Sequence, residues 1–286
     1  MQPPTRPPRR PPAYVWDSSL QADCDRLKPP SQHATRDQLR AIADANQRQL
    51  ATGAFAFGAS TTHSLPSQLL AASPSRPPAA LAVTDCDTAS AAIALSRRSP
   101  TAAPAAVLNF ANAVQRGGGY LTGALAQEED LCRVIPALYP ALLQLPYPLA
   151  PLAVPATHAL IQRVPSSYAV APLATPVVVL TAAAPDLRGG VPSGAAAVAY
   201  AADMRQRVRA VLFAAHAAGC RDIVLGAWGC GVFRNDAQTV ASFFVDALLS
   251  PEWRHRFDSV VFAVPRGARG TVHRIFSNTL DRLTRP

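Results

Sequence analysis

Hydrophobic positions along the chain form short continuous runs that alternate with longer segments of mixed polarity. Five runs have the length of a buried strand, and they cover residues 81–85, 107–112, 176–185, 222–229 and 259–265. Runs that are apolar almost throughout are typical of a central sheet covered on both faces. We expect helices over 89–98, from Gln127 onward, over 195–219 and over 236–250. Strands that alternate with helices predict a three-layer α/β domain.

The N-terminal part of the chain has a different pattern. Residues 1–33 are rich in proline and arginine, which predicts a flexible arm. Residues 34–80 predict a helical N-terminal extension, in which Thr35 is the expected N-cap and Gly53 the expected stop. We expect this extension to form one compact unit with the body, residues 81–286. The proline-rich segment 136–176 predicts only weak strands.

Charge and cysteine content narrow the class of protein. The 286 residues carry a net charge of +9, which favours an acidic partner such as nucleic acid or a polyphosphate. Lys28 is the only lysine, however, and an arginine excess of this kind also fits a GC-rich genome. The five cysteines and six histidines show neither metal-binding nor disulfide spacing. With no secretory signal and no unbroken apolar span, we expect a soluble intracellular protein, cytoplasmic or, in a eukaryotic host, nuclear.

Residues 115–130, QRGGGYLTGALAQEED, combine a triple glycine with two adjacent glutamates. A glycine turn before a helix exposes backbone N–H groups beside the positive end of the helix dipole, which suits a diphosphate, although an ordinary turn explains it too. Glu128 and Glu129 fall in the first turn of the following helix, where the dipole favours carboxylates. Alternatively, one carboxyl donates a proton to a departing oxygen while the other binds hydroxyls, as glycosidic cleavage requires.

A second glycine loop, GAWGCGVFRND at 226–236, follows an apolar strand and precedes a helix. Ligands of open α/β sheets bind at this end of the strands. Two such loops would hold a diphosphate from both sides, and Phe233 would stack on a sugar or base. The alternative is an ordinary strand-to-helix turn.

Four segments in order, VLNFANAVQRGGGYLTGALAQEEDLCR, VLTAAAPD, LGAWGCGVFRND and VVFAV, resemble the bacterial-type poly(ADP-ribose) glycohydrolases. The family's signature is GGG, a short spacer and QEE, and the spacer here is YLTGALA. The similarity covers about residues 81–265 and extends to the helical lead-in. It implies an α/β/α macrodomain with a mixed central sheet and an N-terminal helical extension, and it implies neither a cofactor nor a metal.

The resemblance also implies roles for individual residues. Glu129 would be the general acid that protonates the 2′ oxygen of the next unit's ribose, and Glu128 would position that ribose. Asn112 would face the distal ribose and Asp87 the adenine, while Phe233 would favour cutting from chain ends. The other implied substrate-binding residues are Gly117, Gly118, Gly119, Tyr120, Gln127, Gly229, Cys230, Gly231, Val232 and Asn235.

Two departures from the family pattern affect substrate detail. Gln115-Arg116 precedes GGG where the family often has a proline, and Arg234 follows Phe233 where a small residue is common. The implied substrates are poly(ADP-ribose) and ADP-ribosylated proteins. A reader that binds ADP-ribose without cutting it, and a hydrolase of ADP-ribose attached to protein or nucleic acid, remain alternatives. We expect a monomer, and the basic arm suggests weak nucleic-acid contact.

Overall fold

The computed structural model describes residues 18–27, 34–53, 58–68, 70, 76–98, 103–165, 167–267 and 270–284. Seven strands form one sheet in the order β1-β4-β5-β3-β6-β7-β2. They are β1 (Ser60–Ser64), β2 (Ala80–Thr84), β3 (Ala105–Phe110), β4 (Ala153–Arg163), β5 (Val170–Ala182), β6 (Asp222–Gly226) and β7 (Ser259–Ala263). The strands from β5 to β2 run parallel, whereas β4 and β1 are antiparallel to their neighbours. The predicted mixed sheet is confirmed.

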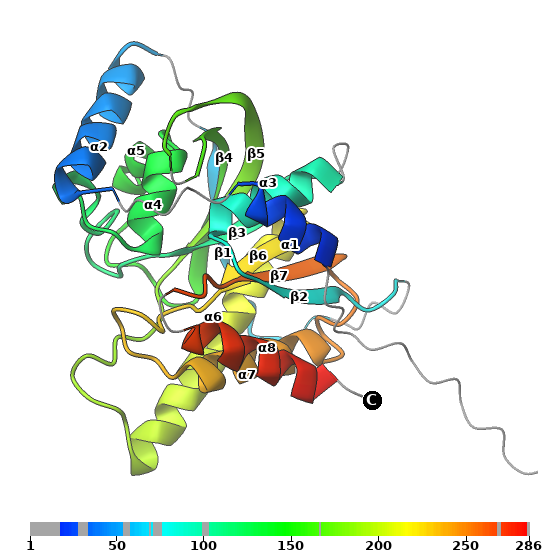
Figure 1. Ribbon diagram of the computed structural model, residues 1–286. Coiled ribbons are helices and arrows are strands. Elements are labelled where there is room, and N and C mark those ends of the chain that lie inside the picture. Colours follow the sequence, from blue (N-terminus) through cyan, green and yellow to red (C-terminus); the bar gives the residue numbers. More distant parts are fainter. Residues whose placement is uncertain are drawn as a thin grey trace, which may run out of the picture.

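Helices cover both faces of the sheet (Figure 1). One face packs against α6 (Gly194–Ala217), α7 (Ala237–Leu249) and α8 (Thr271–Thr284). The other packs against α1 (Ser18–Asp25), α2 (Arg36–Ala51), α3 (Thr88–Arg98), α4 (Gln127–Val134) and α5 (Leu138–Leu143). Each face of the sheet therefore has its own hydrophobic core: the first lies under α6, α7 and α8, and the second under α1 to α5. Successive side chains of a strand point to opposite faces, so Leu108 lies in the first core and Val107 in the second. This is the predicted three-layer α/β/α architecture.

The helix starts follow from local capping. Thr35 caps α2 through a capping box, in which its hydroxyl accepts from the Gln38 amide and the Gln38 side chain accepts from the Thr35 amide. Asp87 caps α3, because its carboxylate accepts from the Ser90 amide at 2.8 Å. The Thr35 cap was predicted from the sequence and is confirmed, and α3 lies where the helix over 89–98 was expected.

The N-terminal segments depart from the prediction in two places. Within the expected flexible arm, Ser18–Asp25 forms α1, whose Leu20 and Cys24 are buried in the core. These two apolar side chains lie one helical turn apart, which is enough to bind a short helix to the sheet. Within the expected helical extension, β1 pairs with β4 at the edge of the sheet. Residues 1–17 and 28–33 lie outside the described residues.

The segment 136–176 is more regular than the sequence predicts. It contains α5, the whole of β4 and the first part of β5, and β4 alone has 11 residues. Pro155 and Pro176 lower the strand propensity of these segments, because proline has no N–H to donate to a neighbouring strand. Cross-strand pairing of β4 with both β1 and β5 determines the structure here instead.

Parallel strands direct their carboxyl ends to one edge of the sheet, and the loops that follow β2, β3, β5, β6 and β7 gather there. In the parts of the chain that the structure describes, no helix is long and apolar enough to cross a membrane.

Truncation of Phe244 would measure how much the first core contributes to the stability of the fold. The fully buried ring of Phe244 lies 6.1 Å from that of Trp228 and 5.7 Å from that of Phe262. We expect Phe244→Ala to lower the free energy of unfolding by about 3–5 kcal/mol, because it leaves a cavity. Urea denaturation measures this, with Val198→Ala as control, since Val198 is 73% exposed on α6 and its truncation should have little effect. Equal losses in both variants would contradict the prediction.

Candidate active site

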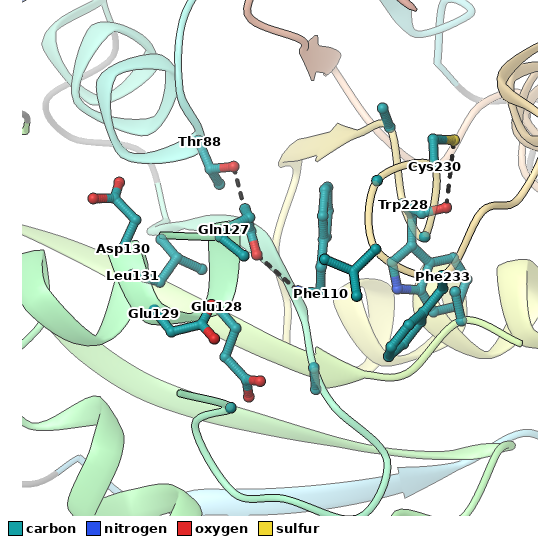
Figure 2. A pocket seen from close by; sticks show the side chains of 18 of the residues that line it. Thr88, Phe110, Gln127, Glu128, Glu129, Asp130, Leu131, Trp228, Cys230 and Phe233 are labelled. Atoms are coloured by element: carbon teal, nitrogen blue, oxygen red, sulfur yellow. Dashed lines mark hydrogen bonds between the residues drawn. The ribbon is translucent and has the colours of Figure 1, made fainter. Parts of the chain in front are cut away.

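A cleft of about 590 Å³ lies at the carboxyl edge of the sheet, within the range of small-molecule sites. One wall comes from the loop after β3 and the start of α4, and the other from the loop after β6 (Figure 2). Phe110, at the end of β3, stands between the two walls. Two chain segments about 100 residues apart therefore face each other across one cavity.

The triple glycine brings its backbone into close contact with the two glutamates. The amide of Gly119 donates to Oε1 of Glu129 at 2.8 Å. A Cβ atom on Gly118 would lie 2.4 Å from the same oxygen and 3.3 Å from Oε2 of Glu128. Gly118 also has φ +52°, a left-handed conformation that side chains rarely adopt. Glycine is therefore required here because both carboxylates lie against the backbone.

Glu128 is held through both of its carboxylate oxygens. Oε2 accepts from the Asn112 amide at 3.0 Å, and Oε1 accepts from Nδ2 of Asn109 at 3.4 Å. The side chain is only 3% exposed. Burial raises the pKa of Glu128 to about 7 in spite of these donors. The Glu128 carboxyl group is therefore partly protonated near neutral pH.

Glu129 differs from Glu128 in its free oxygen. Oε1 is bound to Gly119, whereas Oε2 has no hydrogen-bond partner among the described residues. Glu129 lines the cleft next to Glu128. Two adjacent carboxyl groups thus have unlike surroundings, a condition under which acid–base roles divide.

Gln127 ties the start of α4 to the sheet. Its Oε1 accepts from the Phe110 amide at 2.8 Å, and its Nε2 donates to Oγ1 of Thr88 at 3.0 Å (Figure 2). The same Nε2 also donates to the Leu108 carbonyl at 2.8 Å. Two of the three partner atoms belong to β3, and the third belongs to the first residue of α3. The first residue of QEE therefore fixes where the two glutamates begin.

Asn112 supports the loop with one end of its side chain. Its Oδ1 accepts from the amides of Val114 and Gln115 at 2.9 and 3.0 Å. Within the described residues its Nδ2 has no partner, and Asn112 lines the cleft. One donor thus remains for a ligand.

The opposite wall is the loop from Gly229 to Phe233. The Phe233 carbonyl accepts from the Leu187 amide at 2.9 Å, and the Arg188 guanidinium lies 5.6 Å from the centre of the Phe233 ring. The amides of Gly231, Val232 and Phe233 donate to no residue in the described ranges. Three consecutive unpaired amides are available as donors to an anion.

A family model for the microbial-type PARG catalytic domain matches residues 34–150. The solved structure of poly(ADP-ribose) glycohydrolase from Thermomonospora curvata is 30% identical, covers 84% of this chain and 98% of that one, and has a TM-score of 0.71. This chain belongs to the bacterial-type poly(ADP-ribose) glycohydrolases. The family membership that the sequence predicted is confirmed.

Two further solved structures of the family were determined with ligands. The Thermomonospora curvata enzyme bound to the inhibitor ADP-HPD is 30% identical and has a TM-score of 0.66, with 84% of this chain and 98% of that one covered. The Deinococcus radiodurans enzyme in complex with ADP-ribose is 26% identical and has a TM-score of 0.59, with 95% and 100% covered. A search of curated protein sequences found no significant match.

Most of the residues implied by the glycohydrolase resemblance do line the cleft. They are Asp87, Asn112, Gly118, Gln127, Glu128, Glu129, Gly229, Cys230, Gly231, Val232 and Phe233. Both carboxylate oxygens of Asp87 accept from Ser90, so the residue that was expected to contact adenine also caps α3. Among the described residues, no cluster of His, Cys, Asp and Glu could hold a metal ion.

Tyr120 and Asn235 require a correction, because both lie behind the cleft. Tyr120 is fully buried, and its hydroxyl accepts from Nδ2 of Asn46 at 3.2 Å. Nδ2 of Asn235 donates to the carbonyls of Pro185 and Gly229 at 2.8 and 3.1 Å. Each side chain therefore holds its loop in place from behind.

The triple glycine also departs from its expected role. The Gly118 amide donates to the Gln115 carbonyl, the Gly119 amide to Glu129, and the Gly117 amide toward Glu128. Gly117 and Gly119 do not line the cleft. These amides hold carboxylates and the turn itself, so they are not free to bind a diphosphate.

Several cleft residues were not found from the sequence. Leu125, Ala126 and Asp130 flank the QEE segment, and Val264 and Pro265 follow β7. Burial and the neighbouring Asp87 raise the pKa of Asp130 to about 6. Its only sequence signal was its position directly after the two glutamates.

Gly118→Ala tests the close approach of backbone and carboxylate. The added Cβ must displace Glu129 and adopt a strained backbone, so we expect kcat to fall about 100-fold or more. Gly189→Ala is the matched control, because nothing lies within 4 Å of its Cβ position. Steady-state release of ADP-ribose measures both. A Gly118→Ala enzyme with unchanged kcat would contradict this account of the loop.

Glu128→Gln tests the buried carboxyl through the pH dependence of stability. The pKa of Glu128 is raised from 4.5 to about 7 on folding, so its stabilising contribution is complete below pH 4.5 and lost as the pH rises through 7. This loss amounts to at most about 3 kcal/mol in the wild type. We expect the free energy of unfolding to fall less between pH 5 and pH 8 in Glu128→Gln.

The comparison uses the difference between the two pH values, since the amide also perturbs the hydrogen bonds to Asn109 and Asn112. Asp130, whose raised pKa acts in the same direction, is present in both proteins. Identical pH dependence in both would show that Glu128 ionises normally.

Proposed function

We propose that this glycohydrolase cleaves the ribose–ribose O-glycosidic bond of poly(ADP-ribose), mainly at chain ends, and releases free ADP-ribose. The observation that carries the division of roles is the unequal binding of the two adjacent carboxyl groups. Glu128 is held through both oxygens, whereas Glu129 keeps one oxygen free in the cleft.

Glu129 is the general acid in this proposal. Its free oxygen donates a proton to the 2′ oxygen of the departing unit as the bond from C1″ of the terminal distal ribose breaks. The transition state resembles an oxocarbenium ion, and the alkoxide would be a poor leaving group without that proton. Water then adds to C1″, and its proton returns to the Glu129 carboxylate. Glu128 and the free Nδ2 of Asn112 orient the ribose.

The diphosphate is best assigned to the loop after β6. The free amides of Gly231, Val232 and Phe233 supply donors on the wall opposite the glutamates. This placement keeps the phosphate charges away from the two carboxyl groups. Phe233 then lies near the terminal ribose, which supports the preference for chain ends, and Asp87 remains our candidate for the adenine.

Three finer features of the proposal rest on the sequence. We expect a monomer because the sequence predicts a single compact unit, and an intracellular location because the cysteine spacing predicts no disulfide framework. Weak nucleic-acid contact would come from the basic N-terminal arm, whose first 17 residues lie outside the described ranges.

Glu129→Gln is the decisive variant. The amide keeps the shape of the side chain but cannot donate the proton, so release of ADP-ribose from poly(ADP-ribose) should fall about 100- to 10,000-fold. Binding of free ADP-ribose, measured by calorimetry, should change by less than about threefold, since the cleft is intact. Chromatography of the released nucleotides identifies the product, and Asp246→Asn, an exposed position on α7, is the matched control.

Two results would overturn the proposal. A wild-type protein that binds ADP-ribose but releases nothing from the polymer is a reader, unless it acts on a mono-ADP-ribosylated protein, which the same chromatography detects. Full activity in Glu129→Gln would remove Glu129 as the acid.

A further inference from the structure

The spacer between GGG and QEE lies beneath helix α2. Figure 1 shows α2 beside α4, and α2 packs against both α4 and the short helix η1 (Tyr120–Thr122) of the spacer. Gly123 touches the start of α2 so closely that a Cβ atom would lie 2.3 Å from the Arg36 carbonyl oxygen. The spacer is therefore shaped by a helix from outside the catalytic signature.

Asn46 is the polar residue at the centre of this contact, and it is fully buried. Its Nδ2 lies 3.2 Å from the Tyr120 hydroxyl, 3.0 Å from the Arg133 carbonyl and 3.4 Å from the Cys132 carbonyl. One amide group thus faces both the spacer and the end of α4.

Arg163, on β4, determines which way this amide points. Its Nε donates to Oδ1 of Asn46 at 2.6 Å, and a guanidinium can only donate. Oδ1 must therefore face Arg163, which leaves Nδ2 to donate to Tyr120 and α4. A second nitrogen of Arg163 donates to Oε1 of Gln49 at 2.8 Å, so Gln49 shares the arginine with Asn46.

The three partners of Nδ2 belong to the two elements that place Glu129, the spacer and α4. The Tyr120 amide bonds to the Gly117 carbonyl at 3.0 Å, and Tyr120 follows Gly119, whose amide holds Glu129. Helix α4 has only eight residues, so it is about 12 Å long and its last turn constrains its first. Asn46 therefore fixes the distance between the donor at Gly119 and the carboxylate that accepts from it.

We propose that Asn46 is a positioning residue for hydrolysis, through which the N-terminal extension sets the geometry of Glu129. The role in catalysis rests on the function proposed above. Substitution of a residue with a purely structural role would lower the stability of the protein but leave kcat unchanged in the molecules that fold. A positioning residue lowers kcat with less effect on the affinity for ADP-ribose, because a small displacement of an acid affects chemistry more than binding.

The test compares Asn46→Asp with Gln49→Glu. Each variant places a carboxylate against Arg163 and keeps the size of the side chain. Only Asn46→Asp loses the donors to Tyr120 and α4, since a carboxylate accepts but does not donate. We expect kcat to fall about 10- to 100-fold in Asn46→Asp and less than about twofold in Gln49→Glu. The dissociation constant of ADP-ribose should change by less than about threefold in both.

Two additional measurements keep the outcome decisive. Tyr120→Phe removes only the hydroxyl that Asn46 contacts, and it should lower kcat by about 3-fold or more; it decides the question if Asn46→Asp fails to fold. Hydrogen exchange over residues 117–126 should be faster in Asn46→Asp than in Gln49→Glu.

Unchanged kcat in folded Asn46→Asp, or in Tyr120→Phe if Asn46→Asp does not fold, overturns the inference while the glycohydrolase activity of the wild type stands. If the wild type itself is inactive, the proposed function fails, and the exchange measurement alone decides whether Asn46 holds the spacer.

Discussion

The hydrogen bond from the Gly119 amide to Glu129 is the interaction on which the site depends. It requires that the backbone approach the carboxylate closely, and the bare Cα of Gly118 makes that approach possible. A side chain at Gly118 would occupy the space of the Glu129 oxygen. The spacer and the start of α4 are arranged so that these few atoms meet.

The two loops of the cleft use their backbone amides differently, although both were expected to hold a diphosphate. The amides of the triple glycine hold carboxyl groups, whereas the amides of Gly231, Val232 and Phe233 are free across the cleft. This separation has an electrostatic advantage. A diphosphate beside Glu128 and Glu129 would be repelled by carboxylates at this position.

Support for the site comes from three directions within the fold. Gln127 fixes the start of α4 to β3, and Asn235 holds the loop after β6 to the loop after β5. Asn46 connects α2 with the spacer and with the end of α4. Each of these residues offers an amide side chain, which donates and accepts at once and can therefore link several backbone groups.

The sequence by itself determined the strands of the parallel sheet, the caps of α2 and α3, and the pairing of GGG with QEE. These features are local, since apolar runs, capping side chains and short spacings act between residues close in the chain. Only the tertiary structure decided that β1 and β4 complete the sheet, that α1 packs on it, and that Tyr120 lies behind the cleft. The tertiary structure also decided which groups the glycine amides bind, and it raises the pKa of Glu128 through burial. It likewise brings Asn46 into contact with Tyr120. All of these features depend on contacts between residues that are distant in the sequence and on the water that those contacts exclude. The spacing of residues along the chain does not indicate which distant residues meet.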